Sequence, residues 1–123
     1  MKRLSILGST GSIGTQALET CEKNGWEITA LAAGRSVELA EVQAREFKPQ
    51  FVAMFDKDAA AELKIKLADT DIKVYSGEEG VIAAAENDCD TVLNSVVGIA
   101  GLKPTLAAIN KALPLPLRIR KRL

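Results

Sequence analysis

The chain has 123 residues, of which 47% are hydrophobic and only 4% aromatic, and its formal net charge is zero. This length suits one α/β domain and is too short for a large two-domain enzyme. The sequence contains no histidine, which excludes a Ser–His dyad and an imidazole metal ligand within it. No apolar run approaches the roughly 18–20 residues of a membrane span. We therefore expect a cytoplasmic protein without a membrane or secretory segment.

Strand-like apolar runs alternate with helical patterns along the chain. The expected order is strand 2–7, helix 12–23, strand 27–33, helix 37–47, strand 51–55, helix 59–67, strand 72–75, helix 78–86, strand 90–94 and helix 102–111. The strands are largely apolar on both faces, which is typical of a parallel sheet covered by helices. The pattern predicts an α/β fold, a Rossmann-like doubly wound parallel sheet, in a single domain over residues 1–110.

The two cysteines, Cys21 and Cys89, stand far apart in the sequence and form no C-x-x-C pair. We expect both to be small core residues rather than a disulfide or metal ligands. Helical spacing places Cys21 on the inner face of the first predicted helix, together with Ile13 and Ala17.

A glycine-rich stretch separates the first expected strand from the first expected helix. It reads Gly8-Ser9-Thr10-Gly11-Ser12-Ile13-Gly14, a Gly-x-x-Gly-x-x-Gly spacing that differs from the common dinucleotide fingerprint. Glycines at such a turn let a pyrophosphate approach the backbone and the N–H groups of the helix start. The alternative is a tight turn that needs glycines only for packing. The expected nucleotide-binding residues are Gly8, Thr10, Gly11, Ser12, Ile13 and Gly14.

The turn after the second expected strand indicates which dinucleotide binds. Folds that prefer NAD place an acid about 20 residues after the glycines to hold the ribose 2′-hydroxyl. Here that place is taken by Ala33-Gly34-Arg35-Ser36, and no acid follows until Glu38. A fixed cation beside a hydroxyl suits a 2′-phosphate. Gly34, Arg35 and Ser36 therefore predict NADPH, although Arg35 taken alone is typical of any surface loop.

Several aspartates stand close together and invite a metal assignment. They fall at the ends of expected elements, where solvated helix starts are the better interpretation. We expect no metal site and no catalytic residue among them. The aspartates are Asp56, Asp58, Asp69, Asp71, Asp88 and Asp90.

A third stretch follows the fifth expected strand, at the carboxyl edge where open α/β sheets bind ligands. It reads Val97-Gly98-Ile99-Ala100-Gly101-Leu102-Lys103-Pro104-Thr105-Leu106. Its composition fits both contact with a flat cofactor ring and packing on the sheet. With the two earlier motifs, in the same order and spacing, it resembles the N-terminal cofactor domain of the 1-deoxy-D-xylulose 5-phosphate reductoisomerase family.

The resemblance implies an NADPH-dependent enzyme of non-mevalonate isoprenoid biosynthesis. Such an enzyme isomerises and reduces 1-deoxy-D-xylulose 5-phosphate to 2-C-methyl-D-erythritol 4-phosphate, uses a divalent metal (Mg or Mn), and forms a homodimer. The resemblance implies that Thr10, Gly11, Ser12 and Ile13 hold the pyrophosphate side of NADPH. It also implies that Gly34, Arg35 and Ser36 lie at the 2′-phosphate.

The sequence departs from the family pattern after residue 110. Residues 1–110 carry 11 Lys/Arg and 16 Asp/Glu, whereas residues 111–123 carry five Lys/Arg and no acid. The family continues into Ala-Leu-Ala-Asn-Lys-Glu, which reaches nicotinamide and substrate, and its metal carboxylates follow later. The resemblance therefore implies that this chain alone is catalytically inactive.

A frameshift near residues 110–114 explains the unusual tail. One nucleotide string that encodes Leu115 to Leu123 encodes Ile-Ala-Leu-Ala-Asn-Lys-Glu-Thr-Leu in a neighbouring frame. The gene sequence tests this hypothesis, which fails if no shifted frame restores Ala-Asn-Lys-Glu. The rival interpretation is a basic tail for nucleic acid or anionic lipid. The tail lacks aromatic residues and an amphipathic period, so we expect neither partner.

Two other functions remain open from the residues alone. One is a non-catalytic NADP-binding module that senses redox state through a partner. The other is the cofactor domain of a different NADP-dependent reductase.

Overall fold

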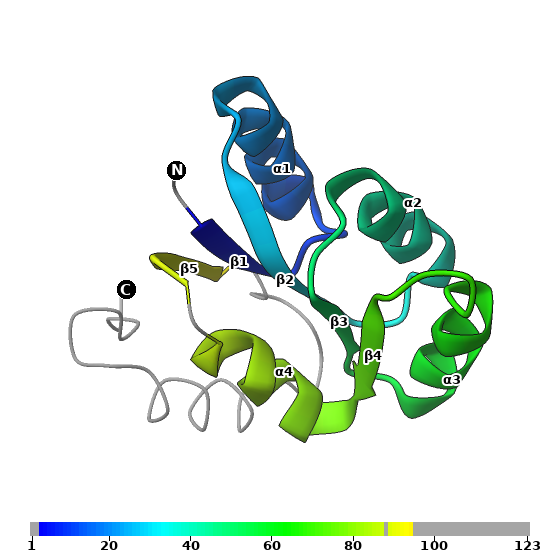
Figure 1. Ribbon diagram of the computed structural model, residues 1–123. Coiled ribbons are helices and arrows are strands. Elements are labelled where there is room, and N and C mark those ends of the chain that lie inside the picture. The colour runs from blue at the N-terminus through cyan, green and yellow to red at the C-terminus, as the bar shows by residue number, and fades with distance from the viewer. Residues whose placement is uncertain (1–2, 88, 95–123) are drawn as a thin grey trace.

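The computed structural model describes residues 3–87 and 89–94 of the chain (Figure 1). The predicted helix 102–111, the motif from Val97 to Leu106 and the basic tail lie outside these residues.

Strands and helices alternate through the described part of the chain, as the sequence predicts. The elements are β1 (Arg3–Leu7), α1 (Ser12–Asn24), β2 (Glu27–Ala33), α2 (Val37–Phe47), β3 (Phe51–Met54), α3 (Lys57–Lys66), β4 (Lys73–Ser76), α4 (Gly77–Glu86) and β5 (Thr91–Asn94). Their order matches the expected order up to residue 94.

The five strands form one parallel sheet in the order β4-β3-β2-β1-β5. The chain moves outward from β1 to β4 and then returns to the other side of β1 for β5. The direction of winding therefore reverses between β1 and β5. In open α/β sheets, ligands bind at such a reversal, outside the carboxyl ends of the strands. The expected doubly wound α/β fold is confirmed.

Helices cover both faces of the sheet (Figure 1). One buried cluster joins the sheet to α1, α2 and α3, and it includes Ile6, Leu18, Leu31 and Leu63. The second cluster joins the opposite face to α4 through Leu7 and Val81, among others. Small residues such as Ala30, Ala32 and Ala53 are fully or almost fully buried in the strands. Burial on both faces explains why the strands are apolar without alternation.

Local chemistry fixes where the helices begin and end. The Asp56 carboxylate accepts a hydrogen bond from the Ala59 N–H at 2.9 Å, so α3 begins at Lys57, two residues before the predicted start. The α1 helix ends at Gly25, whose φ of 67° is left-handed. Lys48 ends α2 with a φ of 49°, directly before Pro49. Asp56 as the capping residue and Asp58 in the first turn thus belong to a helix start, as expected.

The predicted inner face of α1 is wrong at one position. Ile13 is 62% exposed, and the buried residues of α1 are Gly14, Leu18 and Cys21. Positions 14, 18 and 21 follow the i, i+4, i+7 spacing of a buried stripe. Ile13 lies one residue before that stripe and therefore points outward at the start of the helix.

The cysteines differ in burial. Cys21 is 1% exposed in the core, as predicted, whereas Cys89 is only half-buried. Both are free thiols. Partial burial raises the pKa of the Cys89 thiol.

An ion-pair network on the surface links α2 to the turn after α3. Arg45 donates to both carboxylate oxygens of Asp69, at 3.1 and 2.9 Å, and to Glu41 at 3.1 Å. The hydrogen bonds from Arg45 lower the pKa of Asp69. This exposed aspartate is a structural partner of Arg45, consistent with its place at an element end.

Candidate functional site

The pairing of β1 with β2 brings the two predicted binding turns to one edge of the sheet. Leu7 lies opposite Ala32 in the register of the two strands. The N–H groups of Gly8 and Ser9 both donate to the Ala32 carbonyl, at 2.7 and 3.0 Å. The glycine turn after β1 is therefore fixed against the end of β2, one residue before the Gly34 turn begins.

The start of α1 is open to a ligand. Gly11 is the capping residue, in an extended conformation with φ −80° and ψ 173°, and no side chain caps the helix. Within the described residues, the N–H groups of Ser12, Ile13 and Gly14 have no hydrogen-bond partner. These are the first donors of a helix, which carries partial positive charge at this end. An anion of phosphate type fits this position.

The three glycines of the turn differ in how far the fold requires them. Gly8 has a φ of 86°, a left-handed conformation that favours glycine. A Cβ on Gly14 would clash with the Gly8 carbonyl oxygen, so this position needs glycine for packing. A Cβ on Gly11 would meet nothing closer than the same oxygen at 3.6 Å. The packing of the turn therefore leaves room for a Cβ at Gly11.

The second turn presents a cation beside a hydroxyl. Arg35 and Ser36 are exposed, and Gly34 is half-buried. Ser36 precedes α2, and its hydroxyl makes no capping hydrogen bond. Among the described residues, the Arg35 side chain has no ion pair or hydrogen bond. Both groups are thus available to an outside anion.

The Gly34 carbonyl accepts the Asp56 N–H at 3.0 Å, which ties this turn to the next loop along the edge. All nine predicted binding residues are described, and they occupy two adjoining turns at one edge of the sheet. The roles assigned to the individual residues remain predictions.

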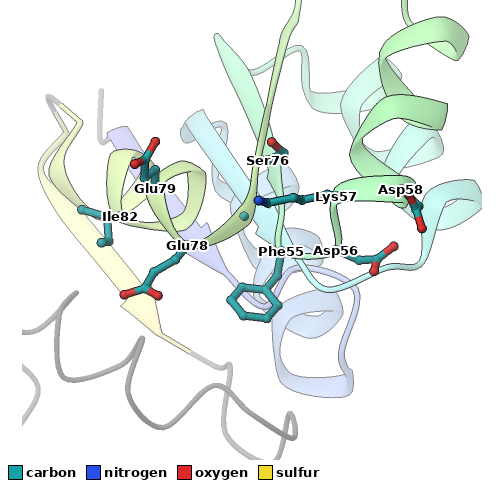
Figure 2. Close-up of a pocket in the computed structure, with 9 residues that line it drawn as sticks. Phe55, Asp56, Lys57, Asp58, Ser76, Glu78, Glu79 and Ile82 are labelled. Carbon is teal, nitrogen blue, oxygen red and sulfur yellow. The ribbon is translucent and has the colours of Figure 1, made fainter.

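A hollow lies further along the same edge of the described structure, at the ends of β3 and β4. Its volume is about 900 Å³, and it contains none of the predicted binding residues. Figure 2 shows Asp56 and Asp58 on one side, Glu78 and Glu79 on the other, and Lys57 between them. Four carboxylates disfavour a pyrophosphate in this hollow.

One buried polar residue beside the turn escaped the sequence prediction. The Gln43 side chain of α2 donates to the Ser9 carbonyl at 2.8 Å. Gln43 is 6% exposed and Ser9 is fully buried. The helical spacing of the sequence indicates its burial, because Gln43 lies on the same helix face as the buried Val37, Ala40 and Ala44.

In the described part of the chain, no group of three or more His, Cys, Asp or Glu side chains is arranged to hold a metal ion. A divalent metal therefore finds no fitting donor set there, and no chemical step is assigned to one. No helix within residues 3–87 and 89–94 has the length and apolar character needed to cross a membrane.

A family model for 1-deoxy-D-xylulose 5-phosphate reductoisomerase matches residues 4–117. This match includes both binding turns and most of the chain. The chain belongs to the 1-deoxy-D-xylulose 5-phosphate reductoisomerase family. Its relatives carry the same name. The 1-deoxy-D-xylulose 5-phosphate reductoisomerase of Agathobacter rectalis is 51% identical to this chain over 111 residues.

Solved structures of reductoisomerases share the fold of this chain. A DOX-P reductoisomerase in complex with magnesium superimposes with a TM-score of 0.80 at 34% identity, over 91% of this chain. The Zymomonas mobilis reductoisomerase in complex with NADPH gives a TM-score of 0.78 at 31% identity, also over 91%. The chain spans only 29% of the Agathobacter enzyme and 29–30% of the two structures.

Proposed function

We propose that this chain is the NADPH-binding part of a reductoisomerase that acts on 1-deoxy-D-xylulose 5-phosphate. The product of the whole enzyme would be 2-C-methyl-D-erythritol 4-phosphate, an intermediate of non-mevalonate isoprenoid biosynthesis. Membership of the family supports the activity, and the relative solved with NADPH supports the cofactor. A divalent metal, a homodimeric assembly and a cytoplasmic location belong to the same proposal for the whole enzyme.

The register of β1 against β2 is the observation that carries the cofactor assignment. Because Leu7 lies opposite Ala32, the open start of α1 and the Arg35–Ser36 pair adjoin at the carboxyl edge. The two features recognise different parts of one ligand. The helix start would hold the pyrophosphate through the N–H groups of Ser12, Ile13 and Gly14. Arg35 and Ser36 would hold the 2′-phosphate.

Bound NADPH supplies a hydride, and the described residues contribute binding and orientation. Residues 1–110 form the cofactor domain in this proposal, and residues 111–123 are a separate segment. Because the chain spans 29% of its relative's length, we expect no turnover by the 123 residues alone. Of the alternatives, a different reductase is disfavoured by the family match, and no observation favours a sensor module.

A titration with both nucleotides tests the cofactor assignment. We expect the purified chain to bind NADPH more tightly than NADH, as measured by the fluorescence of the reduced nicotinamide. Arg35→Ala should weaken NADPH binding by about tenfold or more, because a charge-assisted hydrogen bond to the 2′-phosphate is lost. Its effect on NADH should be small. Addition of 1-deoxy-D-xylulose 5-phosphate and magnesium should produce no NADPH consumption by this chain.

The matched control is Lys57→Ala, which removes a cation from the acidic hollow instead. It should leave the preference for NADPH unchanged. A preference for NADH, or equal NADPH affinity with and without Arg35, would refute the assignment.

A further inference from the structure

The glycine turn is held from behind by a side chain of another helix. The amide NH2 of Gln43 in α2 donates to the Ser9 carbonyl at 2.8 Å. The Thr15 hydroxyl also donates to this carbonyl, at the longer distance of 3.4 Å. Ser9 lies between Gly8 and Thr10, so this carbonyl belongs to the peptide group that enters the centre of the turn.

Because the peptide group is planar, the contact at the Ser9 carbonyl also fixes the direction of the Thr10 N–H. In a trans peptide, the carbonyl of one residue and the N–H of the next point in opposite directions, and no cis bond occurs in the described chain. When Gln43 holds the Ser9 carbonyl inward, the Thr10 N–H is directed away from the buried side. Within the described residues this N–H has no hydrogen-bond partner, as expected of a donor reserved for a ligand.

Stability alone does not explain a glutamine at this position. The second polar atom of its side chain, Oε1, is buried without a partner in the described structure, and so is the Ser9 hydroxyl oxygen. Buried polar atoms that lack partners disfavour the folded state. A methionine of similar length would fill the same space without that cost. The contact is better explained by what it aligns.

We propose that Gln43 is a positioning residue that aims the Thr10 N–H at the pyrophosphate of the bound nucleotide. This proposal rests on the proposed function, because it deepens the same binding site. Gln43 itself does not touch the nucleotide in this account. It also couples the two turns, since its helix, α2, begins at the Arg35–Ser36 pair.

Gln43→Met tests the proposal by removing the donor and keeping the length of the side chain. We expect the Kd for NADPH and the Kd for NADH to rise by the same factor, about tenfold, because both nucleotides share the pyrophosphate. The urea midpoint of unfolding should stay close to that of the parent chain. Glu46→Met, an exposed change in the same helix, is the matched control and should alter neither Kd.

Unchanged affinities in a folded Gln43→Met chain would overturn the proposal and leave the cofactor assignment intact. So would a change confined to NADPH, which would indicate an effect on the 2′-phosphate. A chain that unfolds would indicate a structural role. In that case Thr15→Val provides the test, because it removes the weaker donor to the Ser9 carbonyl. It should raise the Kd values for NADPH and NADH by a common factor that is smaller than about tenfold. Unchanged Kd values would show that the proposal is wrong.

A second measurement does not depend on nucleotide binding. In the free chain, Gln43→Met should shift the backbone amide resonance of Thr10 in a ¹⁵N–¹H NMR spectrum, because the peptide group is released. A Thr10 resonance that does not move would overturn the proposal for Gln43. A parent chain that binds no nucleotide would instead defeat the proposed function, so the two failures are distinguishable.

Discussion

At the scale of single residues, the glycine turn separates requirements of the fold from requirements of the ligand. Gly8 is needed for its positive φ and Gly14 for its contact with the Gly8 carbonyl. Gly11 is the exposed capping residue, and its backbone angles are open to any amino acid. The fold therefore accounts for the first and third glycines of the motif, and the packing of the turn does not account for the central one.

The difference between the two glycines predicts that one alanine substitution lowers stability and the other weakens NADPH binding. Gly14→Ala should lower the free energy of unfolding by about 1–3 kcal/mol, because the added methyl group clashes with backbone. Gly11→Ala should change stability by less than about 0.5 kcal/mol, since its conformation is allowed. Gly11→Ala should nevertheless weaken NADPH binding. Urea unfolding measures the stability of both variants, and nucleotide titration measures their affinity for NADPH. Equal stability losses at the two positions would contradict the prediction.

The sequence pattern predicts the two turns of the site, but not the buried side chain of Gln43 that supports them. Gly8 to Gly14 and Gly34 to Ser36 stand out because glycine and charge at strand ends are visible in the sequence. Gln43 was missed because a glutamine in a helix is usually on the surface, and only its place among apolar residues marks it as buried. Ile13 was assigned to the wrong face because its helix begins at Ser12, too close for the periodicity to be read reliably.

At the scale of elements, the strands and helices were predictable because their signals are local. Both β2 and α2 have the predicted bounds, since an apolar run and a proline define them. The helix α3 begins at Lys57, two residues before its apolar pattern, because Asp56 caps it there. The pairing of β5 beside β1 depends on contacts between distant residues, and no local pattern specifies it.

The cap of α3 gives a testable energy. Asp56→Ala should destabilise the chain by about 1 kcal/mol, because the Ala59 N–H loses its acceptor. Asp58→Ala, in the first turn of the same helix, should lower stability by only about 0.3 kcal/mol, because it removes a negative charge that interacts favourably with the helix dipole. Urea unfolding measures both. Equal losses would show that charge, and not the capping hydrogen bond, stabilises the helix start.

At the scale of the whole molecule, the winding of the sheet reverses beside β1, which is where open α/β sheets bind their ligands. The glycine turn follows β1, the strand at which the winding reverses, and the register of β1 with β2 brings the Gly34 turn to the same edge. The acidic hollow at the ends of β3 and β4 shares this edge but has the wrong charge for phosphates (Figure 2).

Mapping NADPH onto the backbone tests the central claim most directly. Titration of the ¹⁵N-labelled chain should shift the amide resonances of the two turns, at residues 10–14 and 34–36. The same experiment with NADH should shift residues 10–14 and leave residues 34–36 nearly unmoved, because NADH carries no 2′-phosphate. Shifts confined to residues 55–58, 76–79 and 82, which line the acidic hollow, would contradict the account.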